Sequence, residues 1–115
     1  MKAIAESTGE QLRRIAKLSG MSYDSLARVL RTSRRTLGLW LAGEEPGRSN
    51  RAHVTEFTRF FNALCEVVKP ETIGAWMERP SPNFQGSSPM QILERGEIDR
   101  LWRMIWEIRG GNSGD

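Results

Sequence analysis

The sequence predicts an all-α protein in which a bundle of short N-terminal helices packs through a long central helix onto a second small helical unit. Apolar residues recur three and four positions apart in almost every segment, which is the spacing of one helix face. No segment alternates apolar and polar residues with the period of two that is typical of a half-buried strand. Short stretches rich in glycine, proline and serine separate the periodic segments.

Three short helices are expected in the first half, over residues 11–18, 22–30 and 34–41. Gly20 is placed to end the first of them in a left-handed conformation. Ser22 and Ser33 are placed to cap the second and the third. A loop over residues 43–50 follows, because this stretch contains one proline and two glycines.

The longest periodic segment runs from Arg51 to about Val68, and we expect it to form the centre of the core. Its apolar stripe comprises Val54, Phe57, Phe61, Leu64, Cys65 and Val68. Short helices are expected over residues 71–78 and 90–94, and a final helix over 97–109. Residues 79–89 hold three prolines, which predicts a loop between the short helices.

Length and composition restrict the class of protein. A chain of 115 residues fits one compact domain, or two small subdomains that share a core. It has a single cysteine, so an intrachain disulfide is impossible. No apolar run approaches the roughly 20 residues of a membrane span, and no secretory signal is visible, which favours the cytoplasm.

Positive charge is concentrated in the first half of the chain. Residues 1–50 carry nine Lys/Arg against five acidic residues, whereas residues 51–115 carry eight against nine. A basic half of this kind suits a polyanionic ligand such as DNA.

The segment from Ser22 to Gly43 predicts a helix-turn-helix. Two short helices meet across residues 31–33, and Ala27 is small where they would cross. The pattern of Leu26-Ala27, Ser33, Trp40 and Gly43 resembles the helix-turn-helix of the Xre/Cro-type repressors. Arg31 departs from that pattern, because the family often has glycine there. The resemblance implies that the helix after Ser33 enters the major groove of DNA.

Six residues are predicted to contact DNA: Ser22, Ser33, Arg34, Arg35, Gly38 and Arg48. Arginine can bind guanine through two hydrogen bonds, and arginine or serine can hold phosphates. Leu39 falls on the same outer face, where it suits a thymine methyl group or a partner chain. The alternative is a helical hairpin that serves only as scaffold.

A second pattern occupies the C-terminal half. It consists of Trp76, Pro82, Asn83, Phe84, Gly86, Pro89, Leu93, Gly96, Leu101 and Ile105, in this order and with short spacings. The order resembles the toxin-binding domain of the Xre/MbcA/ParS antitoxins. With the helix-turn-helix, the resemblance covers about residues 10–110, and the lack of a long insert is typical of the short MbcA-type antitoxins.

The resemblance implies a division into a helix-turn-helix domain at residues 1–50, a central core helix at 51–69 and a toxin-binding domain at 70–115. It also implies a type II toxin–antitoxin system. The partner is then a RES-type toxin, an enzyme that consumes NAD, whose active site the antitoxin blocks largely through its C-terminal part. Such complexes are homo- or hetero-oligomers that commonly bind their own promoter. The NAD chemistry belongs to the toxin, so no cofactor is expected in this chain.

The final helix has more apolar surface than one core contact requires. At about 100° per residue its apolar arc spans roughly 200°, about twice the width that a one-sided surface helix needs. Trp106 and Met104 lie at the two edges of this arc, and tryptophan is enriched at protein interfaces. The predicted toxin-binding residues are Asn83, Trp102, Met104, Trp106, Arg109, Gly110 and Gly111.

The residue types offer little for catalysis or metal binding. His53 is the single histidine and is expected at the surface, while Cys65 is expected on the buried stripe. A zinc site needs about four such ligands, so neither a metal site nor an enzyme is predicted. The principal alternative to an antitoxin is a transcriptional regulator with a dimerising C-terminal domain and no toxin partner.

Overall fold

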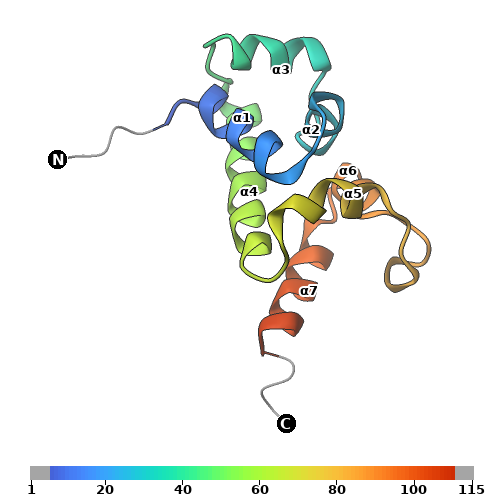
Figure 1. Ribbon diagram of the computed structural model, residues 1–115. Helices are drawn as coiled ribbons and strands as arrows, with labels where there is room; N and C mark the ends of the chain where they lie inside the picture. Colours follow the sequence, from blue (N-terminus) through green and yellow to red (C-terminus); the bar gives the residue numbers. More distant parts are fainter. Residues whose placement is uncertain (1–5, 111–115) are drawn as a thin grey trace, which may run out of the picture.

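The computed structural model describes residues 6–110, and its regular elements within that range are all helical (Figure 1). The α-helices are α1 (Thr8–Ser19), α2 (Tyr23–Val29), α3 (Arg34–Leu41), α4 (Arg48–Cys65), α5 (Ile73–Glu78), α6 (Pro89–Glu94) and α7 (Ile98–Gly110). Two 3-10 turns join them, η1 (Pro70–Thr72) and η2 (Pro82–Phe84). The all-α prediction is confirmed. None of the described helices is both long and apolar enough to cross a bilayer.

The N-terminal and C-terminal helices form a bundle in which α4 is the central helix. The helix α3 lies across one end of the molecule against α1 and α2, while α4 runs from beneath α3 toward the opposite end (Figure 1). The C-terminal elements α5, α6 and α7 follow on the far side of α2, and α7 packs against α4. The last turns of α7 extend beyond the rest of the bundle.

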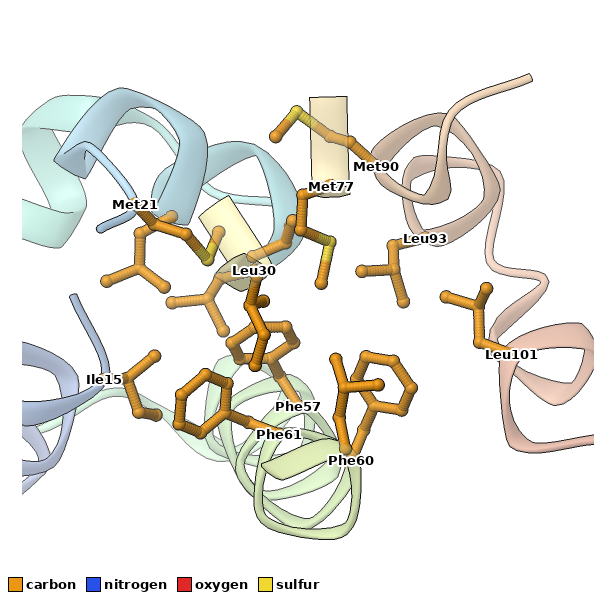
Figure 2. Close-up of a cluster of buried hydrophobic side chains, with 14 of the residues drawn as sticks. Ile15, Met21, Leu30, Phe57, Phe60, Phe61, Met77, Met90, Leu93 and Leu101 are labelled. Carbon is orange, nitrogen blue, oxygen red and sulfur yellow. The ribbon is translucent and has the colours of Figure 1, made fainter. Parts of the chain in front are cut away.

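One cluster of buried side chains runs through all three predicted regions of the chain. Phe57, Phe60 and Phe61 of α4 project into its centre, where Figure 2 shows side chains from both halves around them. Leu30 comes from the N-terminal half, and Leu101 from the C-terminal half. The two halves therefore share a core, as the short length of the chain favours.

The helix α2 joins the two halves at its surface as well as in the core. Its Ser25 hydroxyl donates a hydrogen bond of 2.8 Å to the Glu78 carboxylate at the end of α5. One turn further on, Arg28 forms an ion pair of 2.7 Å with Glu94 at the end of α6. Both C-terminal helices are thus tied to the same short N-terminal helix.

The ends of α1 and α4 differ from the prediction. The helix α1 begins at Thr8 instead of residue 11, because Ser7 and Glu10 form a reciprocal capping box. The helix α4 begins at Arg48 instead of Arg51, so the loop expected over residues 43–50 is shorter. It ends at Cys65 instead of Val68, because the chain tightens into a turn after Glu66 and Pro70 disfavours helical geometry in the residue before it.

Two glycines lie where helices approach closely. A β-carbon on Gly9 of α1 would lie 2.6 Å from the Trp40 carbonyl oxygen, and one on Gly74 of α5 would lie 2.7 Å from the Ser19 carbonyl oxygen. Both contacts are with backbone, which cannot move aside as a flexible side chain can. These positions therefore set how closely α3 and α5 approach α1.

The turn between α2 and α3 holds an arginine in the left-handed region. Arg31 has a φ of 61°, and the amide of Thr32 donates to the Ala27 carbonyl as in a Schellman helix end. Glycine is usual at this position because it has no side chain to clash. The departure at Arg31 noted in the sequence therefore leaves the turn intact, at a cost in backbone strain of roughly 1–2 kcal/mol.

We expect Arg31→Gly to be more stable than Arg31→Ala by about 1 kcal/mol. Both variants remove the same side chain, but only glycine relieves the left-handed strain. Urea unfolding followed by far-UV circular dichroism measures the difference. Equal stability of the two variants would show that the turn is not strained at this position.

Trp40→Ala should destabilise the whole protein. Trp40 is 3% exposed, and truncation of such a side chain costs about 3–5 kcal/mol. Leu39→Ala is the matched control, because Leu39 lies next to it on α3 but is 45% exposed, and we expect a change within about 0.5 kcal/mol. Thermal unfolding of the two variants tests this, and similar melting temperatures would contradict it.

Candidate functional site

A hollow of about 520 Å³ lies between α5, the η2 loop and α7. Its lining residues are Trp76, Ser81, Asn83, Phe84, Gln85, Arg100, Arg103, Met104 and Glu107. Two predicted toxin-binding residues, Asn83 and Met104, therefore line the same surface although 21 positions separate them in the sequence. The loop that carries η2 extends away from the helices beside α7 (Figure 1).

Local hydrogen bonds fix the shape of the η2 loop. The Ser81 hydroxyl accepts a hydrogen bond of 3.1 Å from the Asn83 amide, and the amides of Phe84 and Gly86 donate to the Ser81 carbonyl. Phe84 is buried and anchors the turn in the core. The chain leaves the turn through Gln85, whose φ is 54°. The exposed side chain of Asn83 is thus presented on a rigid turn.

Arg100 holds this loop against α7. Its guanidinium donates to Gln85 Oε1 at 2.8 Å and to Glu97 Oε1 at 3.0 Å. It also lies 5.7 Å from the centre of the Phe84 ring, within the range of a cation–π contact. The hydrogen bond from Arg100 lowers the pKa of Glu97 below its ordinary value, so this carboxylate is charged at neutral pH. One wall of the hollow is therefore fixed by charge-assisted hydrogen bonds.

The helix α7 presents apolar side chains on two further flanks. Trp106 is 65% exposed, as expected for an edge of the apolar arc, whereas Met104 at the other edge is half-buried. Trp102 is also half-buried, because its ring packs edge-on against Phe60 with the ring centres 5.9 Å apart. Ile108 is 44% exposed although its angle places it near the buried face, because α7 extends beyond the core there.

The end of α7 is bound to the end of α4. The Arg109 guanidinium forms an ion pair with the carboxylate of Glu66, the residue that follows α4. Arg109 is therefore a support for α7 in the isolated chain, in addition to its predicted toxin contact. Gly110 is the last residue of α7, and the predicted Gly111 lies outside the described residues.

The two predicted serines at the N-terminal surface act as helix caps. The Ser22 hydroxyl accepts from the Ser25 amide at 3.0 Å, and the Ser33 hydroxyl from the Thr36 amide at 2.9 Å. Each cap satisfies one of the free amides in the first turn of its helix. The serines therefore have a structural role whether or not they also contact a phosphate.

The predicted arginines at the start of α3 differ in their surroundings. Arg34 lies 3.6 Å from the Asp24 carboxylate and 5.2 Å from the centre of the Tyr23 ring. It also passes close to Gly38, where an added β-carbon would lie 3.7 Å from its guanidinium. Arg35 is exposed, and its side chain has no hydrogen bond or ion pair within residues 6–110. Arg35 is thus the more available of the two for a ligand.

The remaining residues that the sequence analysis singled out are Arg48, Cys65 and His53. Arg48 is exposed in the first turn of α4, some distance along the chain from Arg35. Cys65 is half-buried, and burial raises the pKa of its thiol, which disfavours the reactive thiolate. His53 was expected at the surface but is half-buried, and its buried Nδ1 has no hydrogen-bond partner among residues 6–110. Among the described residues no cluster of three or more metal-ligating side chains occurs.

Sequence reasoning missed Arg100, Arg103 and Trp76 as residues of the surface around Asn83. Arg100 and Arg103 lie three positions apart on the polar face of α7, with Met104 one turn after Arg100, and this spacing is a usable signal. The approach of Trp76 to this face depends on the path of the loop between α5 and α6. No spacing rule predicts that path.

Comparison with known proteins gives relatives with this fold. No protein-family model matches the chain. The mycobacterial cidal antitoxin MbcA of Mycobacterium bovis and of two strains of Mycobacterium tuberculosis is 26% identical over 87 residues, which are 75% of this chain and 77% of each relative. The chain is a homologue of the MbcA antitoxins. The predicted resemblance to MbcA-type antitoxins is thereby confirmed.

The solved structures agree with this conclusion at the level of the fold. A chain in the crystal structure of the M. tuberculosis MbcT–MbcA toxin–antitoxin complex matches with a TM-score of 0.74 and 22% identity. The match covers 94% of this chain and 98% of that one. The arrangement of helices is therefore MbcA-like over nearly its whole length.

Proposed function

We propose that this chain is the antitoxin of a type II toxin–antitoxin pair. The observation that carries the proposal is its homology to MbcA, whose fold recurs in a toxin–antitoxin complex. Following the family resemblance, the partner is a RES-type toxin that consumes NAD, and the antitoxin blocks its active site in the cytoplasm. An antitoxin acts by binding, which agrees with the absence of an activated nucleophile at Cys65.

The proposed toxin contact is the C-terminal surface of α7 and the η2 loop. Trp106 and Ile108 are large apolar side chains left at the surface, and a partner that covers them would remove apolar area from water. The hollow that another face of α7 forms with the η2 loop adds the amide of Asn83 and the guanidinium of Arg103. Apolar anchors next to a few polar groups are the usual composition of a protein interface.

The proposed promoter contact is the outer face of α3. Arg35 and Leu39 are exposed there, and the first half of the chain carries the excess positive charge. An arginine that no neighbour neutralises is suited to a guanine edge or a phosphate. The antitoxin, alone or with its toxin, would then repress its own promoter.

Trp106→Ala should abolish protection from the toxin while leaving the protein folded. A buried interface tryptophan contributes about 2 kcal/mol or more, which is roughly a 30-fold loss of affinity. The measurement is growth of cells that co-express the variant with the toxin encoded by the neighbouring gene. Leu18→Ala is the control, because Leu18 is also a large exposed apolar side chain, at 44% exposure, but lies on α1. Full rescue by a folded Trp106→Ala protein would place the toxin contact elsewhere, and a neighbouring gene product without toxicity would favour a simple regulator.

Arg35→Ala should weaken binding to the promoter but not to the toxin. The loss of one good base contact reduces discrimination by about 1–3 kcal/mol. Fluorescence anisotropy with a promoter fragment and with an unrelated fragment, at two salt concentrations, separates base contacts from general attraction. Arg79→Ala serves as the control, because its side chain is exposed and has no ion pair within the described chain. Equal promoter affinity of both variants would leave α3 as scaffold.

A further inference from the structure

A second and larger groove, of about 890 Å³, lies on the outer face of α4. Its lining residues are Pro46, Gly47, Arg48, Arg51, Ala52, Thr55, Glu56, Arg59 and Trp102. The α4 residues among them recur at helical spacing, on the side of the helix opposite Phe57 and Phe61. The groove is open to solvent and joins the start of α4 to one flank of α7.

The groove carries uncompensated positive charge. Three arginines line it against a single acidic residue, Glu56. Arg51 donates to the Pro46 carbonyl at 3.2 Å and lies 3.9 Å from the Glu45 carboxylate. Arg48 and Arg59 have no ion pair or side-chain hydrogen bond within residues 6–110. They are about 16 Å apart along α4, which is the length of a short peptide segment.

The residues between the arginines and the residue on α7 that borders the groove leave room for a protein segment to bind. Ala52 and Thr55 are small, so a backbone can come close to α4 between the arginines. Trp102 forms the wall and is held by its edge-on contact with Phe60. One turn further along the same flank of α7 stands the exposed Trp106. The groove is thus continuous with the proposed toxin contact.

In two antiparallel registers a second copy of this chain fits the groove poorly. An antiparallel pairing of α4 with itself centred on Thr55 sets Arg51 against Arg59 of the other copy. The register that pairs Arg51 with Glu56 sets Arg48 against Arg59. Each arrangement leaves like charges opposed, which is unfavourable at an interface.

We propose that this groove docks an acidic segment of the toxin, with Arg48, Arg51 and Arg59 binding its carboxylates and Trp102 contacting an apolar side chain. The inference rests on the proposed function, because it concerns the same partner. It extends the toxin contact from the C-terminal half to the outer face of α4. Arginine and tryptophan together are typical of residues that dominate protein interfaces.

The test compares Kd values for the purified toxin of the neighbouring gene at low and at moderate salt by titration calorimetry. The variants are Arg59→Glu and Arg48→Glu/Arg59→Glu. Both residues are exposed and unpaired among the described residues, so both variants should fold. In the double variant, Arg48→Glu also places a glutamate in the first turn of α4, which the helix dipole favours. We expect at least a tenfold loss of affinity in the double variant and a weaker dependence on salt.

Lys17→Glu/Arg79→Glu is the matched control, because it changes the net charge equally outside the groove. An equal loss of affinity in the control would reduce the effect to net charge and overturn the proposal. Unchanged toxin affinity of the double variant, or weaker promoter binding by Arg59→Glu with intact toxin binding, would overturn it as well. If the wild-type chain does not bind the toxin, the proposed function fails and the groove proposal falls with it.

Discussion

The burial of the phenylalanine face of α4 is the interaction on which the rest of the structure depends. Phe57 lies 6.2 Å from both Phe60 and Phe61, measured between ring centres, and all three are almost fully buried. No other described helix is as long, and the N-terminal and C-terminal helices both pack their apolar residues against it. Because a short chain has little core to spare, one aromatic cluster must serve both halves.

This constraint explains why so much of the fold could be predicted from the sequence. Each helix buries one stripe against a common centre, and such stripes leave a clear period of three and four residues. The same reasoning placed Trp40 inside and Leu39 and Trp106 outside. The ends of the helices were less accessible. The capping box of Ser7 and Glu10 starts α1 at Thr8, three residues before the predicted start at residue 11 and ahead of any apolar position of its stripe.

The parts of the site that sequence reasoning missed depend on contacts between distant segments. Asn83 and Met104 were each singled out, but their common hollow exists because Arg100 bonds to Gln85 across 15 positions. Likewise Gly74 has no local signal, since its role is the close approach to the carbonyl of Ser19. Trp102 was expected at a partner surface, and its edge-on contact with Phe60 holds it as a wall of the groove on α4. Periodicity describes one helix at a time and cannot supply these pairs.

The ties from α2 to Glu78 and Glu94 have a consequence for how such proteins can be recombined. A chimaera that exchanges the C-terminal half for that of a relative keeps both contacts only if acidic residues occupy both positions. Without them, Ser25 would lose its hydrogen bond and Arg28 its ion pair. The side chains of the shared core beneath these two residues would also no longer match. The two halves therefore behave as one structural unit, and substitutions on exposed faces disturb the fold less than an exchange of whole halves.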